Sequence, residues 1–261
     1  STHPAHIPYY RMESWCKNAV GNEEDYVIEA INQNLTTLGM SDHGPYPDDR
    51  LGFRMEYKEL PEYISTVENL KEKYKDKIKL YCGLEIEYDP NSYDYYTYLL
   101  NELHLDYLAL GQHVFTHKGN FCNSFELTST DEYISYANSI VEAFSTGFFK
   151  FLCHPDLIFL NDFPWDDNCE KACDIIVEGA KKYNMILEIN GNGVRRGINE
   201  FCDGKRYHYP HENFWKKVSK NNLRVIINSD CHNPKDLWDE NMDKAYEFAN
   251  KLDLNIVYDI F

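Results

Sequence analysis

Apolar residues follow two alternating patterns along this chain. Stretches with an apolar side chain every three or four positions, the repeat of an amphipathic helix, alternate with short apolar runs typical of buried strands. Helices are predicted at about 22–35, 58–74, 92–103, 131–143, 168–183, 211–221 and 234–252. Strands are predicted at 37–40, 78–82, 105–110, 148–153, 185–189 and 224–227, with a closing strand at 255–260.

This alternation predicts about seven βα units and therefore an α/β fold whose parallel strands are covered by helices. A closed barrel and an open doubly wound sheet both satisfy the pattern. The sequence has no GxGxxG phosphate fingerprint, which disfavours the nucleotide-binding form of the open sheet. Neither a linker nor a repeat divides the chain, so we predict a single domain over residues 1–261.

Composition excludes some classes of partner. The chain has 26 Lys and Arg against 43 Asp and Glu, a formal net charge of −17. This charge argues against broad binding to nucleic acid or to an anionic membrane, but it allows a small anionic substrate. No 18-residue apolar stretch or signal-peptide pattern is present, and the eight cysteines form no CxxC pair. We therefore expect reduced thiols and a cytoplasmic location. The sequence predicts no oligomeric state.

Residues that can carry chemistry are concentrated directly after the predicted strands. They are Ser41-Asp42-His43, Gly83-Leu84-Glu85-Ile86-Glu87, Gly111-Gln112-His113, His154-Pro155-Asp156, Glu188-Ile189-Asn190 and Asn228-Ser229-Asp230-Cys231-His232. In an α/β barrel these positions converge on one rim. One histidine there is usually structural, but four histidines with Glu85 and Asp230 would repel and lose solvation without a metal. Imidazole and carboxylate ligands suit Zn, Mn or Fe, so a multinuclear metal site is predicted.

The ordered motifs SDH, GLE, GxH, CHPD, EIN and SDxH resemble the PHP (polymerase and histidinol phosphatase) family over essentially the whole chain. Within the family, the chain is most similar to histidinol-phosphate phosphatases. The resemblance implies a distorted (βα)7 TIM-like barrel with three divalent metals at its rim, as Zn, Mn or Fe. It implies as metal ligands His43, Glu85, His113, His154, Asp230 and His232. Glu85 would bridge two metals.

The N-terminus departs from the family pattern. The family opens with HxH on the first strand, whereas this chain has His3-Pro4-Ala5-His6. In a regular strand His3 and His6 face opposite sides, although a bulge brings both inward. We expect His6 to be a ligand and keep His3 as a candidate whose alternative is a lost ligand. Glu13 stands near where relatives place a ligand, and its alternative is a solvated loop position.

Substrate-binding residues follow from the same resemblance. The stretch from Glu188 to Arg195 is similar to the family's EIN-x-x-G-x-R motif, which implies that Arg195 binds phosphate. A guanidinium is a bidentate donor to phosphate, and Arg196 is the alternative. Further candidates at the rim are Arg54, His208 and Tyr209, each of which is equally well explained as an ordinary surface residue.

The implied reaction is hydrolysis of a small phosphate monoester, with histidinol phosphate, from histidine biosynthesis, as the leading substrate. Divalent metals would hold the phosphate oxygens and activate water, and Arg195 would stabilise the developing charge. Both His154 and Asp230 are candidates for protonating the leaving group. The alternatives are a protein-tyrosine phosphatase, a nucleoside-bisphosphate phosphatase or a non-catalytic metal-binding relative. A nuclease is disfavoured by the acidic charge, and an amidohydrolase by the lack of a lysine at a strand end.

Overall fold

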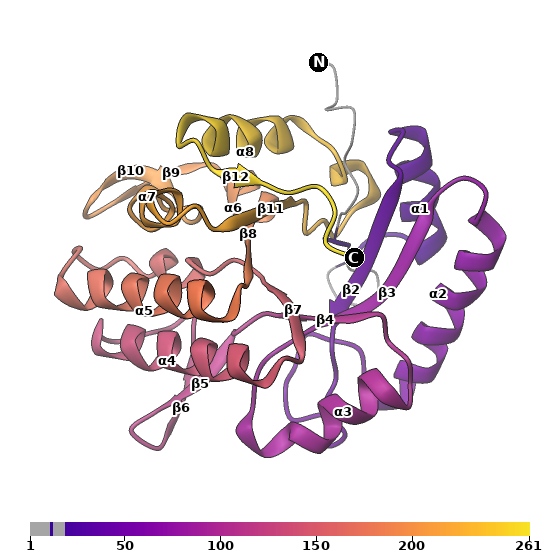
Figure 1. The fold of residues 1–261 in the computed structure, drawn as a ribbon, viewed down its shortest axis with the longest axis horizontal. Helices are drawn as coiled ribbons and strands as arrows, with labels where there is room; N and C mark the ends of the chain where they lie inside the picture. Colours follow the sequence, from indigo (N-terminus) through magenta and orange to yellow (C-terminus); the bar gives the residue numbers. More distant parts are fainter. Residues whose placement is uncertain (1–10, 13–18) are drawn as a thin grey trace.

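A parallel β-sheet surrounded by helices forms the centre of the protein (Figure 1). The computed structural model describes residues 11–12 and 19–261. Within them, the large sheet has the strand order β1-β2-β3-β4-β7-β8-β11-β12. Its strands are β1 (Arg11–Met12), β2 (Thr37–His43), β3 (Lys79–Ile86), β4 (Tyr107–Leu110), β7 (Phe149–Leu152), β8 (Ile186–Asn190), β11 (Arg224–Asn228) and β12 (Asn255–Ile256). All neighbouring pairs are parallel, and the sheet curls into a distorted α/β barrel, as predicted.

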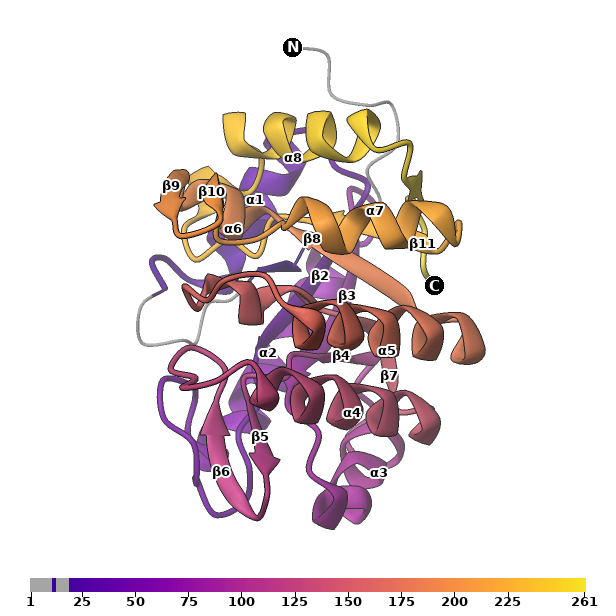
Figure 2. The same ribbon diagram turned by 90° about the vertical axis from the view of Figure 1, so that its left-hand side faces the viewer.

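The helices lie between successive strands in the chain and cover the outer side of the sheet. They are α1 (Glu23–Asn32), α2 (Leu60–Tyr74), α3 (Tyr93–Asn101), α4 (Asp131–Thr146), α5 (Asp167–Tyr183), α6 (Gly191–Arg195), α7 (Glu212–Lys220) and α8 (Glu240–Lys251). Figure 2 shows α4, α5, α7 and α8 stacked in chain order along one side of the molecule. This order is expected when each helix returns the chain to the start of the next parallel strand.

Both faces of the sheet are buried, and side chains alternate between them with the period of two that strands impose. On β4, Leu108 and Leu110 belong to the large cluster that packs against the helices, whereas Tyr107 and Ala109 face inward. The inner cluster consists of Tyr107, Ala109, Phe151, Cys153, Ile186, Ile226 and Ile260. Polar residues that continue this inward alternation, such as Glu188 after Ile186, therefore lie inside the barrel at the carboxyl rim.

Most predicted helices and strands are present, but the C-terminal part differs from the expectation. Asn22 caps α1, which begins where it was predicted, and forms a capping box with Asp25. The predicted helix at 234–252 is wrong at its start, because Pro234–Asp236 forms a separate 3-10 turn and Asp239 caps α8. The closing strand is also shorter than predicted, since it pairs with β11 only at Asn255–Ile256.

Two hairpins at the rim have no counterpart in the sequence prediction. They are β5 (Val114–His117) with β6 (Asn120–Asn123), and β9 (Ile198–Phe201) with β10 (Gly204–Tyr207). The first hairpin turns at Lys118 and Gly119, whose φ angles of 50° and 78° suit a two-residue turn of the primed type. Residues that flank the hairpins, His113, Phe125, Arg196 and Tyr209, line the functional cavity described below.

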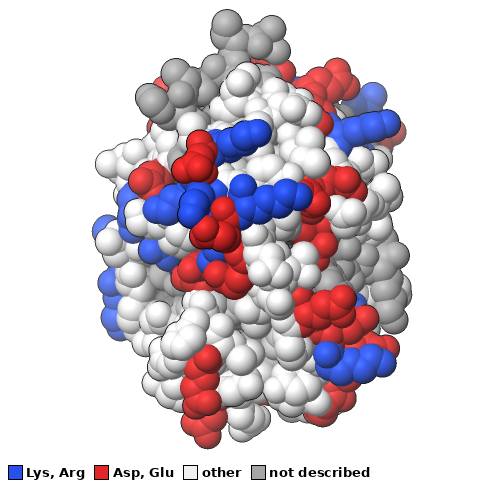
Figure 3. All heavy atoms as spheres, turned by 90° about the vertical axis from the view of Figure 1, so that its right-hand side faces the viewer, with Lys and Arg blue, Asp and Glu red and all other residues white. Residues whose placement is uncertain are grey.

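Charged side chains of both signs are interspersed on the face that carries α1 and α2 (Figure 3). The lysines of this region are paired with acidic groups: Lys71 with Glu68 and Asp106, Lys73 with Glu24, and Lys75 with Glu72. The described part of this face has no continuous basic track of the kind that a long nucleic acid requires. No described helix is both long enough and apolar enough to span a bilayer.

Candidate metal centre

The ends of β2, β3 and β4 bring three potential metal ligands together. In the parallel register His43 lies beside Glu85, and Glu85 lies beside Ala109 on β4, two residues before Gly111 and four before His113. Ligand atoms of His43, Glu85 and His113 all lie within 4.8 Å of one another. Two imidazoles and a carboxylate at this spacing fit a divalent cation such as Zn or Mn. The donor set therefore agrees with the metal chemistry that the motifs predict.

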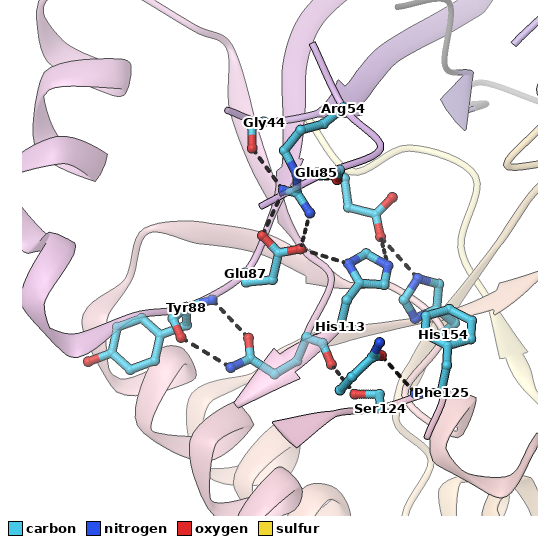
Figure 4. A network of polar contacts seen from close by, with 12 residues as sticks. Gly44, Arg54, Glu85, Glu87, Tyr88, His113, Ser124, Phe125 and His154 are labelled. Atoms are coloured by element: carbon cyan, nitrogen blue, oxygen red, sulfur yellow. Dashed lines mark hydrogen bonds and ion pairs between the residues drawn. The ribbon is translucent and has the colours of Figure 1, made fainter. Parts of the chain in front are cut away.

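Glu85 lies at the centre of this group and contacts two histidines. Its side chain is fully buried, and its Oε1 lies 3.0 Å from Nε2 of His154 and 3.3 Å from Nε2 of His113 (Figure 4). A buried carboxylate needs such partners, because leaving water costs a charged group several kcal/mol. One oxygen of Glu85 thus lies between two imidazoles, and the bridging role that the resemblance implied stays a prediction.

Gly111 makes room for the Glu85 carboxylate. A Cβ atom at this position would lie 2.1 Å from Oε1 of Glu85 and 2.8 Å from its carboxyl carbon. Because Glu85 is enclosed on all sides, it cannot move aside without losing its contacts to His113 and His154. The glycine in the Gly-x-His motif is thus explained by the volume of the neighbouring ligand.

We expect Gly111→Ala to displace Glu85 and to lower activity about 100-fold, the effect of a shift of about 1 Å in a catalytic group. Gly52→Ala is the matched control, because a Cβ there meets no atom within 4 Å. Metal content and the rate of phosphate release measure the effect. A variant at Gly111 with the metal content and rate of the wild type would contradict this role.

Burial sets the protonation of His43. The pKa of this imidazole falls to about 3, because burial disfavours its charged form and outweighs the attraction of Glu85. His43 is therefore neutral at physiological pH. A neutral imidazole has the lone pair that a metal ligand needs.

His154 and Asp230 follow their strands with backbone angles that are rare for residues with a Cβ. Their φ angles are 29° and 49°, both in the left-handed region. Such conformations cost about 1 kcal/mol or more and are concentrated at functional sites. In Asp230, Oδ2 accepts a hydrogen bond from Nδ2 of Asn190 at 2.8 Å. The turned backbone and the amide together fix the direction of the Asp230 carboxylate.

A second buried carboxylate, Glu188, anchors this side of the rim. Its two oxygens accept hydrogen bonds from the side-chain amides of Asn190 at 2.9 Å and Asn228 at 2.7 Å. Asn190 therefore links Glu188 to Asp230, and its Oδ1 also caps the short helix α6. Asn190 orders the site through these contacts.

The rim surrounds a cavity of about 320 Å³. It is lined by His43, His113, Phe125, His154, Leu157, Asn192, Arg195, Arg196, Tyr209, Asp230, His232 and Asp236. Five of the six predicted rim ligands line this cavity. The sixth, Glu85, does not line it but contacts two of the others, His113 and His154. His208 does not line it, and its Nδ1 lies 3.2 Å from the Asn199 amide. His3, His6 and Glu13 fall outside the described residues.

The two arginines of the cavity have different surroundings. Arg195 donates from Nε to Asp239 at 2.9 Å and from its two Nη atoms to the carbonyl and hydroxyl of Ser229, each at 2.6 Å. Arg196 is exposed, and its guanidinium lies 5.7 Å from the centre of the Tyr209 ring. Arg195 therefore holds the loop that carries Asp230. Arg196 lines the cavity, and its side chain forms no hydrogen bond to the residues that the structure describes.

Sequence reasoning missed several residues of the site, among them Glu87 and Phe125. Glu87 lies two positions after Glu85 and points to the same side, so the Glu-x-Glu spacing could have identified it. It binds Arg54, which was expected only at the rim. Phe125 stacks on His113 with ring centres 6.2 Å apart and planes within 11°. It follows the unpredicted hairpin β5–β6, so no strand-end pattern marked it.

Residues 12–192 match the family model for the PHP domain. This match covers more than half of the chain, and the protein belongs to the PHP family, as its ordered motifs predicted.

Individual relatives are similar to this chain over most of their length. The chain is 22% identical to the histidinol-phosphatase of Bacillus subtilis, covering 81% of this chain and 87% of the relative. It is 23% identical to a Deinococcus radiodurans protein named "probable histidinol-phosphatase", covering 84% and 83%. The structure of histidinol phosphate phosphatase from Lactococcus lactis, complexed with Zn, L-histidinol and phosphate, matches with a TM-score of 0.68 at 17% identity. That match covers 97% of this chain and 95% of the other, and it confirms the barrel fold.

Proposed function

We propose that this protein is a metal-dependent phosphatase that hydrolyses a small phosphate monoester, with histidinol phosphate as the leading substrate. The observation that carries the proposal is the cavity in which four histidines and Asp230 meet above the buried Glu85, with two arginines in its wall. The names of the relatives support the choice of substrate. We further propose that residues 1–261 act as one domain.

The ligands in the described residues are His43, Glu85, His113, His154, Asp230 and His232, and we propose that His6, with His3 and Glu13 as candidates, completes the set. Bound divalent cations, up to three as Zn, Mn or Fe, would polarise phosphoryl oxygens and lower the pKa of a water molecule towards neutrality. The chain's own contribution is to hold neutral imidazoles and carboxylates at fixed positions. Burial of Glu85 and the strained backbones at His154 and Asp230 provide that rigidity.

We propose Arg196 as the principal phosphate-binding group and Arg195 as a second donor that also positions the loop of Asp230. A guanidinium beside a phosphate offers two parallel N–H donors, which fixes the orientation of the phosphate. Arg196 is available for this role because its side chain only stacks on Tyr209. His208, which directly follows β10, stays a substrate-binding candidate, and burial together with the nearby Arg196 lowers its pKa.

We propose His154 and Asp230 as the two candidates for protonating the leaving alcohol. His154 and Asp230 both face the cavity, and each is held by its neighbours, His154 by Glu85 and Asp230 by Asn190. The aromatic rings of Phe125 and Tyr209 line the same space and offer apolar contact to the organic part of the substrate. A cavity of about 320 Å³ suits a small ester better than a nucleic-acid strand.

Arg196→Ala is expected to raise KM about tenfold, the loss of one charge-assisted hydrogen bond to phosphate of roughly 1.5 kcal/mol. Lys205→Ala, an exposed cation on β10 outside the cavity, should leave KM unchanged and controls for net charge. Initial rates over a range of substrate concentrations provide the measurement. Equal KM values for the two variants would count against Arg196.

A panel of three substrates tests the proposed function. Histidinol phosphate, a phosphotyrosine peptide and a nucleoside 3′,5′-bisphosphate are each offered to protein loaded with Mn or Zn, and released phosphate is measured. We expect the highest kcat/KM with histidinol phosphate. Preference for either of the other two would reassign the substrate, and no hydrolysis of any of them by metal-loaded protein would refute the phosphatase.

A further inference from the structure

We infer that Arg54, Glu87 and His113 form a buried positioning chain that sets the metal affinity of the His43–Glu85–His113 group. The inference rests on the proposed metal site and adds positioning residues to it. In Figure 4 the chain runs from Arg54 through Glu87 to His113, and from His113 to Glu85. It joins the segments that follow three successive strands, β2, β3 and β4.

Glu87 is fixed from every side. Its side chain is only 2% exposed, and its two oxygens bind the two Nη atoms of Arg54 at 2.8 and 2.9 Å. Oε1 also lies 3.0 Å from Nδ1 of His113. The Glu87 carbonyl accepts hydrogen bonds from the hydroxyls of Tyr46 at 2.7 Å and Tyr96 at 2.8 Å. Neither the backbone nor the carboxylate of Glu87 can turn without breaking several of these hydrogen bonds.

This geometry selects one tautomer of His113. An ionised carboxylate only accepts hydrogen bonds. Nδ1 of His113 is therefore the donor of the hydrogen bond that Glu87 accepts. The other ring nitrogen, Nε2, faces Oε1 of Glu85 at 3.3 Å. His113 and Glu85 would together hold a divalent cation at this position. Carboxylates that hold metal-binding histidines in this way commonly change metal affinity by about 10- to 100-fold.

Arg54 forms a bidentate ion pair with Glu87 and connects the chain to the loop after β2. Its side chain is 9% exposed, and Nη1 also donates to the Gly44 carbonyl at 2.9 Å. A second ion pair, Arg50 with Asp89, connects the same loop to the segment after β3 at 2.8 Å. This pair is 43% and 26% exposed and contacts no predicted ligand. The molecule therefore contains a second, more exposed ion pair between the same two segments that lacks the proposed role.

The test compares metal affinity with stability in five proteins: the wild type, Glu87→Gln, Arg54→Met, the double variant Arg54→Met/Glu87→Met, and Arg50→Met. Zn affinity is measured by competition with a chromophoric chelator, and stability by the urea midpoint.

Arg54→Met leaves a buried charge unpaired and should lower the urea midpoint. The double variant removes both charges and should recover much of that loss. We expect Zn affinity to fall about 10- to 100-fold in Glu87→Gln and to stay low in the double variant. Arg50→Met should keep the affinity of the wild type.

The inference is overturned if Glu87→Gln binds Zn as tightly as the wild type, or if the double variant recovers both stability and affinity. The second result would show that Arg54 and Glu87 serve the fold alone. Wild-type protein that binds no Zn at the rim would instead refute the proposed metal site itself. The two failures are therefore distinguishable in one experiment.

Discussion

Replacing Glu85 with glutamine is expected to lower the rate of phosphate release at least about 1,000-fold. A bound metal supplies several kcal/mol of transition-state stabilisation, and about 4 kcal/mol corresponds to a factor of 1,000. Glu85 contacts His113 and His154 through one oxygen and lies within ligand distance of His43. Glutamine keeps the size of the side chain but removes its charge, so the proposed metal site would lose its central carboxylate.

Metal content and phosphate release are measured together for this variant. Glu102→Gln is the control, because Glu102 is exposed at the end of α3 and should keep both values. The folded state of each variant is checked by its urea midpoint. Glu85→Gln with the metal content and the rate of the wild type would remove Glu85 from the proposed site.

The second large effect is expected for Arg195→Met. Arg195 forms a mostly buried ion pair with Asp239 and two hydrogen bonds to Ser229, the neighbour of Asp230. Removing one partner of such a pair leaves the other charge uncompensated and costs about 3 kcal/mol. We therefore expect a loss of about 3 kcal/mol in the free energy of unfolding. We also expect activity to fall, because the loop of Asp230 loses its main support.

Arg206→Met separates these two effects. Arg206 pairs with Asp203 at 3.0 Å, and the exposed fractions of the two side chains, 15% and 17%, match the 12% and 19% of Arg195 and Asp239. It lies outside the cavity, so its variant should lose comparable stability but keep kcat/KM. Urea denaturation and steady-state kinetics give both quantities. If both variants lost activity equally, Arg195 would have no special connection to the site.

The barrel and the position of its rim could be predicted because both depend on local patterns. Apolar runs and helical repeats predicted the order of strands and helices, and polar residues such as His43 and Glu85 after those runs marked the carboxyl rim. The strand ends were misjudged for a physical reason. β2 continues to His43 and β3 to Ile86, past their predicted ends, because the polar side chains there are buried in the site instead of exposed in loops.

Contacts between distant segments could not be predicted in the same way. Arg54 and Glu87 meet only because the loop after β2 folds back on the end of β3, and no periodicity encodes that return. The position of Arg195 shows the same limit. Its motif suggested a phosphate-binding group, but its hydrogen bonds to Ser229 and Asp239 depend on the packing of α6 beside α8. The contact between His113 and Glu85 likewise depends on the register of β3 and β4.

Our central claim is that the rim cluster binds divalent metal and thereby hydrolyses a phosphate monoester. Its most direct test strips the wild-type protein of metal, adds back Zn or Mn in steps, and follows both bound metal per chain and phosphate released from histidinol phosphate. We predict no release by the stripped protein and a rate that rises with bound metal until the cluster is filled. Equal rates with and without bound metal would contradict the claim.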